Sequence, residues 1–176
     1  ATNQNDILHR AISKGSYEAE KVSETISPSM DIQIASNFER LIFDLNNGDD
    51  QQTSLDMKNI KEKGQYLIND DKLNKISENF LSARMSEDET LEVIKKVYEK
   101  YSVVLDPHTA IGYGAFDKHN LKGNNIVLAT AHPCKFPDAV SKAINLKSDL
   151  PKDLEFILNE KEDYDIVENN LEKIKN

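Results

Sequence analysis

The sequence predicts an α/β fold in which a partial parallel sheet is flanked by helices. Two short apolar runs, residues 103–105 and 125–129, lack the alternation of a half-exposed strand and are typical of strands that are covered on both faces. Each run precedes a segment with helical character, residues 109–118 and 137–144. Helices and strands that follow one another in this order indicate a layered α/β domain.

The first half of the chain is predicted to be largely helical. Ser36 and Glu39 have the spacing of a capping box, and they would start a helix that ends at residues 46–48, Asn-Asn-Gly. Residues 50–65 and 72–83 are predicted to form two further helices.

The clearest helix spans residues 86–101. Ser86 and Glu89 form a second capping box, in which each side chain satisfies a backbone N–H of the first helical turn. Apolar side chains then recur at helical spacing: Leu91, Ile94, Val97, Tyr98 and Tyr101. The tail from Leu150 onward is rich in Lys, Glu and Asn, and we expect one or two surface helices there.

Length and charge limit the classes of protein that fit. The chain has 176 residues, with 22 Lys and Arg against 31 Asp and Glu, and its net charge is −9. This length fits one domain, residues 1–176. The negative charge argues against nucleic-acid binding, and no run approaches the roughly 20 apolar residues of a membrane-spanning helix. Cys134 has no partner for an internal disulfide, so we expect a reducing compartment and a cytoplasmic protein.

Ligands of open α/β sheets bind beyond the carboxyl ends of the strands. That rule indicates two segments of this chain. Residues 106–109 read Asp-Pro-His-Thr, and residues 130–135 read Thr-Ala-His-Pro-Cys-Lys. Histidine, cysteine and carboxylate side chains are therefore expected at one edge of the sheet.

Three interpretations of this edge stay open. A metal site would use His132, Cys134, His108 and Asp106, but the His-x-Cys spacing is not a recognised zinc pattern, and a second paired motif is absent. A nucleophilic Cys134 activated by His132 is the second interpretation. In the third, these residues only cap strand and helix ends, and composition and spacing favour this one.

Four sequence blocks resemble threonine synthases of the bacterial and fungal type. They are ATNQNDIL at residues 1–8, SPSMDI at 27–32 with SNFERL at 36–41, LDPHTA at 105–110, and ATAHPCKFPDAV at 129–140. The blocks occur in the family's order and cover nearly the whole chain. The resemblance implies the C-terminal portion of a pyridoxal-phosphate enzyme of fold type II, the fold of the tryptophan synthase β-subunit superfamily.

Threonine synthase converts O-phosphohomoserine and water into threonine and phosphate. The resemblance implies this activity for the complete protein, with pyridoxal 5'-phosphate as cofactor and O-phosphohomoserine as substrate. The family's cofactor-binding lysine and glycine-rich phosphate loop lie N-terminal to the portion that this sequence resembles. We therefore expect the chain alone to be inactive and to have the missing N-terminal half of the same protein as its partner.

The resemblance also implies roles for individual residues. Thr130 matches the hydroxyl residue that contacts the pyridine nitrogen of the cofactor, and Ala131 and His132 lie beside it on the same turn. Asp106 matches an acidic residue near the cofactor. Lys135 is a candidate for a phosphate group of the substrate because of its charge, and a surface lysine that caps the turn is the alternative. No residue of this chain is expected to be the catalytic base, and no metal is expected.

Other functions stay open beside this one. A binding or interaction module could use the same scaffold without the chemistry, whereas another enzyme of the superfamily, such as a dehydratase, is disfavoured by the SPSMDI and SNFERL blocks. Because a missing half would leave an open sheet edge and an uncovered apolar face, we expect the isolated chain to self-associate or to be marginally stable.

Overall fold

The structure is a computed structural model and describes residues 1–175. Its helices and strands follow one another in this order: α1 (Ile7–Lys14), β1 (Ser16–Glu18), η1 (Pro28–Met30), α2 (Phe38–Leu45), α3 (Asp50–Lys63), β2 (Gln65–Leu67), α4 (Asp70–Ser77), α5 (Glu87–Tyr101), α6 (Pro107–His119), η2 (Pro133–Lys135), α7 (Pro137–Ile144), η3 (Lys152–Asn159) and α8 (Leu171–Ile174). The η elements are 3₁₀ helices.

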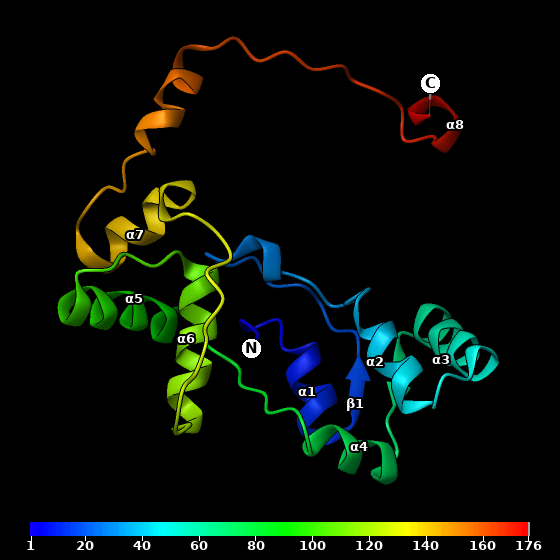
Figure 1. Cartoon of the computed structure of the whole chain (residues 1–176). Helices are drawn as coiled ribbons and strands as arrows, with labels where there is room; N and C mark the ends of the chain where they lie inside the picture. Colours follow the sequence, from blue (N-terminus) through cyan, green and yellow to red (C-terminus); the bar gives the residue numbers. More distant parts are fainter. Residues whose placement is uncertain (176) are drawn as a thin grey trace.

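The elements pack around two hydrophobic cores, which the segment 78–86 joins (Figure 1). The N-terminal core is built by α1 to α4 with the two strands, and it buries Ile42 and Ile76. The second core is built by α5, α6 and α7, and it buries Ile94 and Ile111. In this second core α5 packs against both α6 and α7.

The first residues of the chain run beside the segment that joins the cores. Thr2 and Arg84 form an isolated parallel bridge. The N–H of Thr2 donates to the carbonyl of Ala83 at 3.0 Å, and the N–H of Met85 donates to the carbonyl of Thr2 at 2.9 Å. The N-terminus of the chain is therefore fixed next to the second core.

The predicted parallel sheet is not found within residues 1–175. The sheet of this structure is the antiparallel pair β1 and β2, in which Ser16 pairs with Leu67. Residues 103–105 and 125–129, the two predicted strands, have no strand structure. A strand needs a neighbour to satisfy its backbone N–H and C=O groups, and the described part of the chain places none beside either run.

Residues 126–129 nevertheless run as an extended segment alongside α6 (Figure 1). Val127 packs where α6 has Gly112, since a Cβ added at that glycine would lie 3.5 Å from Val127 Cγ1. Ile126 and Leu128 are 90% and 75% exposed. Within the described residues this segment forms no backbone hydrogen bond to another element. It therefore presents apolar side chains and unpaired backbone groups to solvent.

The predicted capping box at the start of α5 is confirmed. Ser86 Oγ accepts the N–H of Glu89 at 3.2 Å, and the Glu89 carboxylate accepts the N–H of Ser86 at 2.8 Å. Lys118 of α6 lies 2.7 Å from the same carboxylate. The hydrogen bond from Lys118, followed by that from Ser86, lowers the pKa of Glu89. The box therefore also joins α5 to α6.

The capping box predicted at Ser36 is wrong. α2 begins at Phe38, and its N-cap residue Asn37 forms no side-chain capping hydrogen bond. Contacts from elsewhere fix this start, because the Phe38 ring stacks on Tyr17 with centroids 5.1 Å apart. The hydroxyl of Tyr17 also accepts the N–H of Ala35 at 2.8 Å. Tertiary packing has overridden the local signal.

The other predicted helices are present, with shifted ends. α2 ends at the predicted Asn-Gly turn, where Asn47 and Gly48 have φ values of 57° and 81°. The helix expected over residues 72–83 runs from Asp70 to Ser77. α1 was not predicted.

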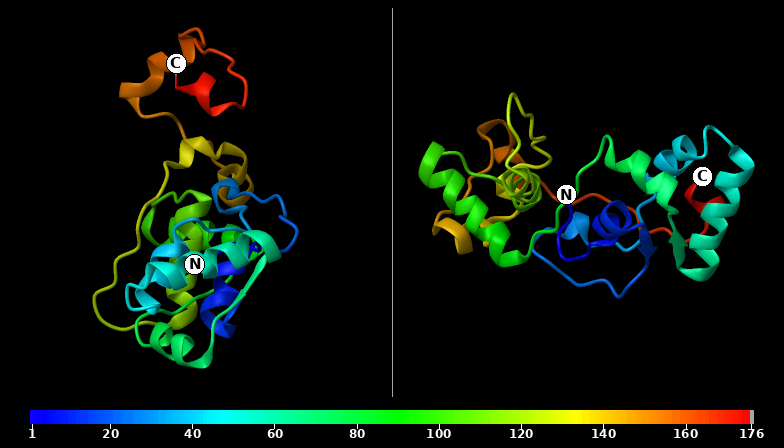
Figure 2. Two further views of the ribbon diagram at one scale, coloured as in Figure 1. Left: turned by 90° about the vertical axis from the view of Figure 1, so that its right-hand side faces the viewer. Right: turned by 90° about the horizontal axis from the view of Figure 1, so that it is seen from below.

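The tail contains η3 and α8, which have no buried residue. Figures 1 and 2 show that the tail extends away from both cores. Among residues 1–175, no helix is both long enough and apolar enough to cross a lipid bilayer.

The two Ser-x-x-Glu motifs offer a matched test of the α5 cap. Ser86→Ala removes a formed cap, so we expect it to lower the free energy of unfolding by about 1 kcal/mol. Ser36→Ala removes an exposed hydroxyl that caps nothing, so we expect a change within about 0.5 kcal/mol. Urea unfolding of both variants measures the difference, and equal losses would contradict the assignment of the caps.

Candidate functional site

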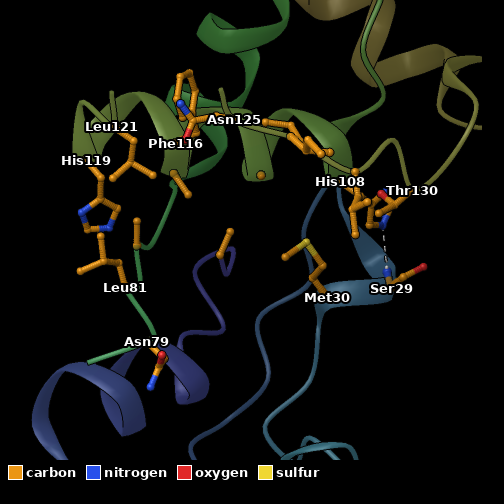
Figure 3. A pocket seen from close by; sticks show the side chains of 17 residues that line it. Ser29, Met30, Asn79, Leu81, His108, Phe116, His119, Leu121, Asn125 and Thr130 are labelled. Atoms are coloured by element: carbon orange, nitrogen blue, oxygen red, sulfur yellow. Dashed lines mark hydrogen bonds between the residues drawn. The ribbon is translucent and has the colours of Figure 1, made fainter. Parts of the chain in front are cut away.

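A pocket of about 750 Å³ lies between α6, the extended segment 125–130 and the segment that joins the cores (Figure 3). Phe116 and Leu121 line one end of it, and Thr130 lies at the other end. In Figure 3 the side chains of Ser29 and His108 lie at the same end as Thr130. This volume is within the range of small-molecule sites.

Asp106 is a buried acidic residue at the start of α6, near this end of the pocket. It is 1% exposed and caps α6. Its Oδ1 accepts the N–H groups of His108 and Thr109 at 2.9 and 3.3 Å, and its Oδ2 accepts the hydroxyl of Thr109. Pro107, the first residue of the helix, has no N–H to satisfy. Both carboxylate oxygens therefore have donors that offset the cost of burial.

Thr109 connects the start of α6 to the turn at Thr130. A hydroxyl has one proton and two lone pairs. The hydroxyl of Thr109 donates a hydrogen bond to Asp106, and its oxygen accepts the N–H of Thr130 at 3.0 Å. The backbone of Thr130 is thus fixed to α6, while its own hydroxyl has no partner among the described residues.

His108 links α6 to two other segments. Its Nδ1 lies 3.1 Å from Asp106 Oδ1, and its Nε2 accepts the N–H of Ser29 at 3.3 Å, the bond drawn in Figure 3. The ring packs against Phe136, with centroids 4.7 Å apart. A donor at Nε2 and a carboxylate at Nδ1 assign the neutral tautomer that carries its proton on Nδ1.

A buried polar network holds the segment that carries Ser29. Asp31 Oδ1 accepts the side-chain amides of Asn3 and Asn5 at 2.7 and 3.0 Å. The hydroxyl and the N–H of Thr25 donate to the same carboxylate at 2.6 and 2.8 Å. Because Asn3 and Asn5 are buried, the network ties the first residues of the chain to this loop. The network therefore helps to position Ser29, which itself lies in the 3₁₀ helix η1.

The predicted residues of the turn 130–135 contact the protein in different ways. His132 caps η2, since its Nδ1 accepts the N–H of Cys134 at 3.2 Å. Ala131 is half-buried, and Lys135 is exposed with no ion pair within residues 1–175. The contact between His132 and Cys134 involves the backbone and not the thiol, so the geometry does not support a thiol nucleophile activated by this histidine.

The metal interpretation also finds no support. Within the part of the chain that the structure describes, no three His, Cys, Asp or Glu side chains are grouped so that they could hold a metal ion. Of the four candidates, Asp106 and His108 are bound to each other and to the protein around them.

Two residues of this site were not predicted. Thr109 has a local signal, because Asp106-Pro107 marks an N-cap followed by proline and so places Thr109 at the third helical position, within reach of the cap. Ser29 has no such signal, because its partner His108 is 79 residues away in the sequence.

Comparison with known sequences confirms the predicted resemblance. A family model described as "Threonine synthase, C-terminal" matches residues 109–176. Threonine synthase of Pseudomonas aeruginosa is 38% identical over 178 residues, which cover 99% of this chain and 38% of that protein. Threonine synthase of Saccharomyces cerevisiae is 39% identical over 209 residues, which cover 98% of this chain and 40% of that protein. The chain therefore spans about two fifths of the length of these relatives.

Comparison with solved structures also finds threonine synthases. The crystal structure of pyridoxal-phosphate-bound threonine synthase from Brucella melitensis matches with a TM-score of 0.88 and 40% identity, over 99% of this chain and 38% of that one. The yeast threonine synthase structure matches with a TM-score of 0.82 and 39% identity, over 92% of this chain and 37% of that one. The structural likeness extends over the N-terminal core as well as the region of the family match.

Proposed function

We infer that this chain is the C-terminal part of a threonine synthase, which converts O-phosphohomoserine and water into threonine and phosphate. The observation that carries this inference is the similarity to threonine synthases along 99% of the chain, at 38% identity in sequence and a TM-score of 0.88 in structure. Since the chain spans 38% of these relatives, the activity is proposed for the complete protein and not for residues 1–176 alone.

The residues around Thr130 fit a pyridoxal 5'-phosphate site. The Thr130 hydroxyl has no hydrogen-bond partner within residues 1–175, and Thr130 borders a pocket of about 750 Å³ and has a backbone N–H that is bound to Thr109. A neutral hydroxyl suits the ring nitrogen of this cofactor, because it does not stabilise a protonated pyridinium as a carboxylate would. When bound, the cofactor supplies the electron sink that elimination and replacement at the side chain of an amino acid require.

The residues of this chain would hold and orient the reactants. We propose that Thr130 contacts the ring nitrogen, with Ala131 and His132 beside it on the turn. Asp106 lies at the start of α6, and its buried carboxylate orders that end of the site. Lys135 is exposed and has no ion pair among the described residues, so its ammonium is available to a phosphate group of the substrate.

The rest of the site would come from the N-terminal part of the same protein. Among the residues that the structure describes, the backbone of the extended segment 126–129 has no partner, and its apolar side chains are exposed, as in a strand without neighbours. Ala1 lines the same pocket as this segment, so residues that precede Ala1 in a longer protein would enter beside it. We propose that strands of the N-terminal part pair with residues 126–129 and form a sheet with this segment.

The complete protein is expected in the cytoplasm, where Cys134 stays reduced. Its accumulation in an oxidising compartment, seen with a fluorescent fusion, would contradict this location.

The uncovered segment predicts that residues 1–176 self-associate when the N-terminal part is absent. Changing Ile126 and Leu128 to Asn should shift the chain toward monomer, because these exposed side chains would no longer bury one another. Sedimentation velocity measures the shift. The matched control changes Leu154 and Leu158 of the tail to Asn, and an equal effect of that control would contradict the assignment to residues 126–129.

The activity is tested with the complete protein. We expect it to bind pyridoxal 5'-phosphate with a visible absorbance band and to release phosphate from O-phosphohomoserine, whereas residues 1–176 do neither. Thr130→Val should lower kcat by about tenfold, the value of one hydrogen bond, while Thr130→Ser retains most of it. A complete protein that binds the cofactor and releases no phosphate would contradict the proposed activity and favour a binding module.

A further inference from the structure

We propose that Thr109 is a positioning residue that sets the place of Thr130 in the cofactor site. This inference rests on the proposed function, in which Thr130 contacts the cofactor, and adds a residue that acts through it. Thr109 is 5% exposed and lies in the first turn of α6, 21 residues before Thr130 in the sequence.

The two hydrogen bonds of Thr109 need a hydroxyl at this position, because one is donated and the other is accepted by the same oxygen. A carboxylate oxygen accepts hydrogen bonds, and Asp106 accepts one from the hydroxyl of Thr109. The oxygen of Thr109 must then act as the acceptor for the N–H of Thr130, at 3.0 Å. A valine has the same shape but no such oxygen, and it would leave both the carboxylate and the N–H short of a partner.

This contact is also the point where the extended segment is tied down. Among residues 1–175, residues 126–131 form one hydrogen bond to another element, and it is the bond from the N–H of Thr130 to the hydroxyl oxygen of Thr109. The other contact that places the segment is that of Val127 with α6, and the neighbouring side chains of Ile126 and Leu128 are exposed. Loss of the bond would free the backbone of Thr130, and its hydroxyl would no longer face the ring nitrogen in one fixed position.

The start of α6 is a rigid reference for this contact. Asp106, Thr109 and the first backbone N–H groups of the helix form one set of hydrogen bonds around a buried carboxylate. The position of Thr130 is therefore set by its hydrogen bond to the helix. Preorganisation of this kind raises ligand affinity because less conformational freedom is lost on binding.

The test compares Thr109→Val, Thr109→Ser and Thr90→Val in the complete protein. Thr90 is the matched control: it is 1% exposed, and its hydroxyl makes a hydrogen bond at 2.7 Å to the carbonyl of Ser86 in α5. We expect Thr109→Val to weaken pyridoxal 5'-phosphate binding by about fivefold to tenfold, the value of one hydrogen bond. Thr109→Ser should bind within about twofold of the unchanged protein, because it retains the oxygen.

A second readout does not depend on the cofactor. In the same proteins without pyridoxal 5'-phosphate, the N–H of Thr130 should exchange with solvent faster in Thr109→Val and at the original rate in Thr109→Ser and Thr90→Val. Unchanged exchange in Thr109→Val would overturn the inference, and so would a loss of affinity equal to that of Thr90→Val. Absence of cofactor binding by the unchanged protein would instead contradict the proposed function, and the exchange rates would still decide the role of Thr109.

Discussion

The buried carboxylate of Asp106 is the constraint on which the geometry of the site depends. A charge that is 1% exposed must be surrounded by donors, and here they come from the first turn of α6 and from the side chains of His108 and Thr109. Each of these side chains then reaches a different loop. His108 accepts the N–H of Ser29, and Thr109 accepts the N–H of Thr130. One carboxylate thus relates two loops that are far apart in the sequence.

A second carboxylate, the half-buried Asp31, has a similar role for the loop that carries Ser29. It receives donors from the first residues of the chain and from Thr25. These contacts fix the loop that includes Ser29 between the two cores. The loops of this site are therefore ordered by polar networks around Asp31 and Asp106, while the hydrophobic cores order the helices. Such networks specify position well because an unpaired buried group is costly.

The sequence predicted correctly those features that depend on residues close together in the chain. The capping box at Ser86, the Asn-Gly end of α2 and the helix after Asp106-Pro107 formed as expected, because each depends on residues within one helical turn. The start of α2 depends on the distant ring of Tyr17, and its prediction from Ser36 was wrong. The missed α1 has a signal in the Gly15 that follows it with a φ of 70°.

The parallel sheet could not form from this chain because a strand depends on partners that the described residues do not contain. Of the candidate site, the sequence indicated both segments and the resemblance named Thr130, but the contacts from Thr109 and Ser29 required the folded structure. We propose that residues 126–129 become a paired strand beside Thr130 in the complete protein. Amide hydrogen exchange of this segment tests it most directly. We predict slow exchange in the complete protein and fast exchange in residues 1–176 alone, and fast exchange in both would contradict the account.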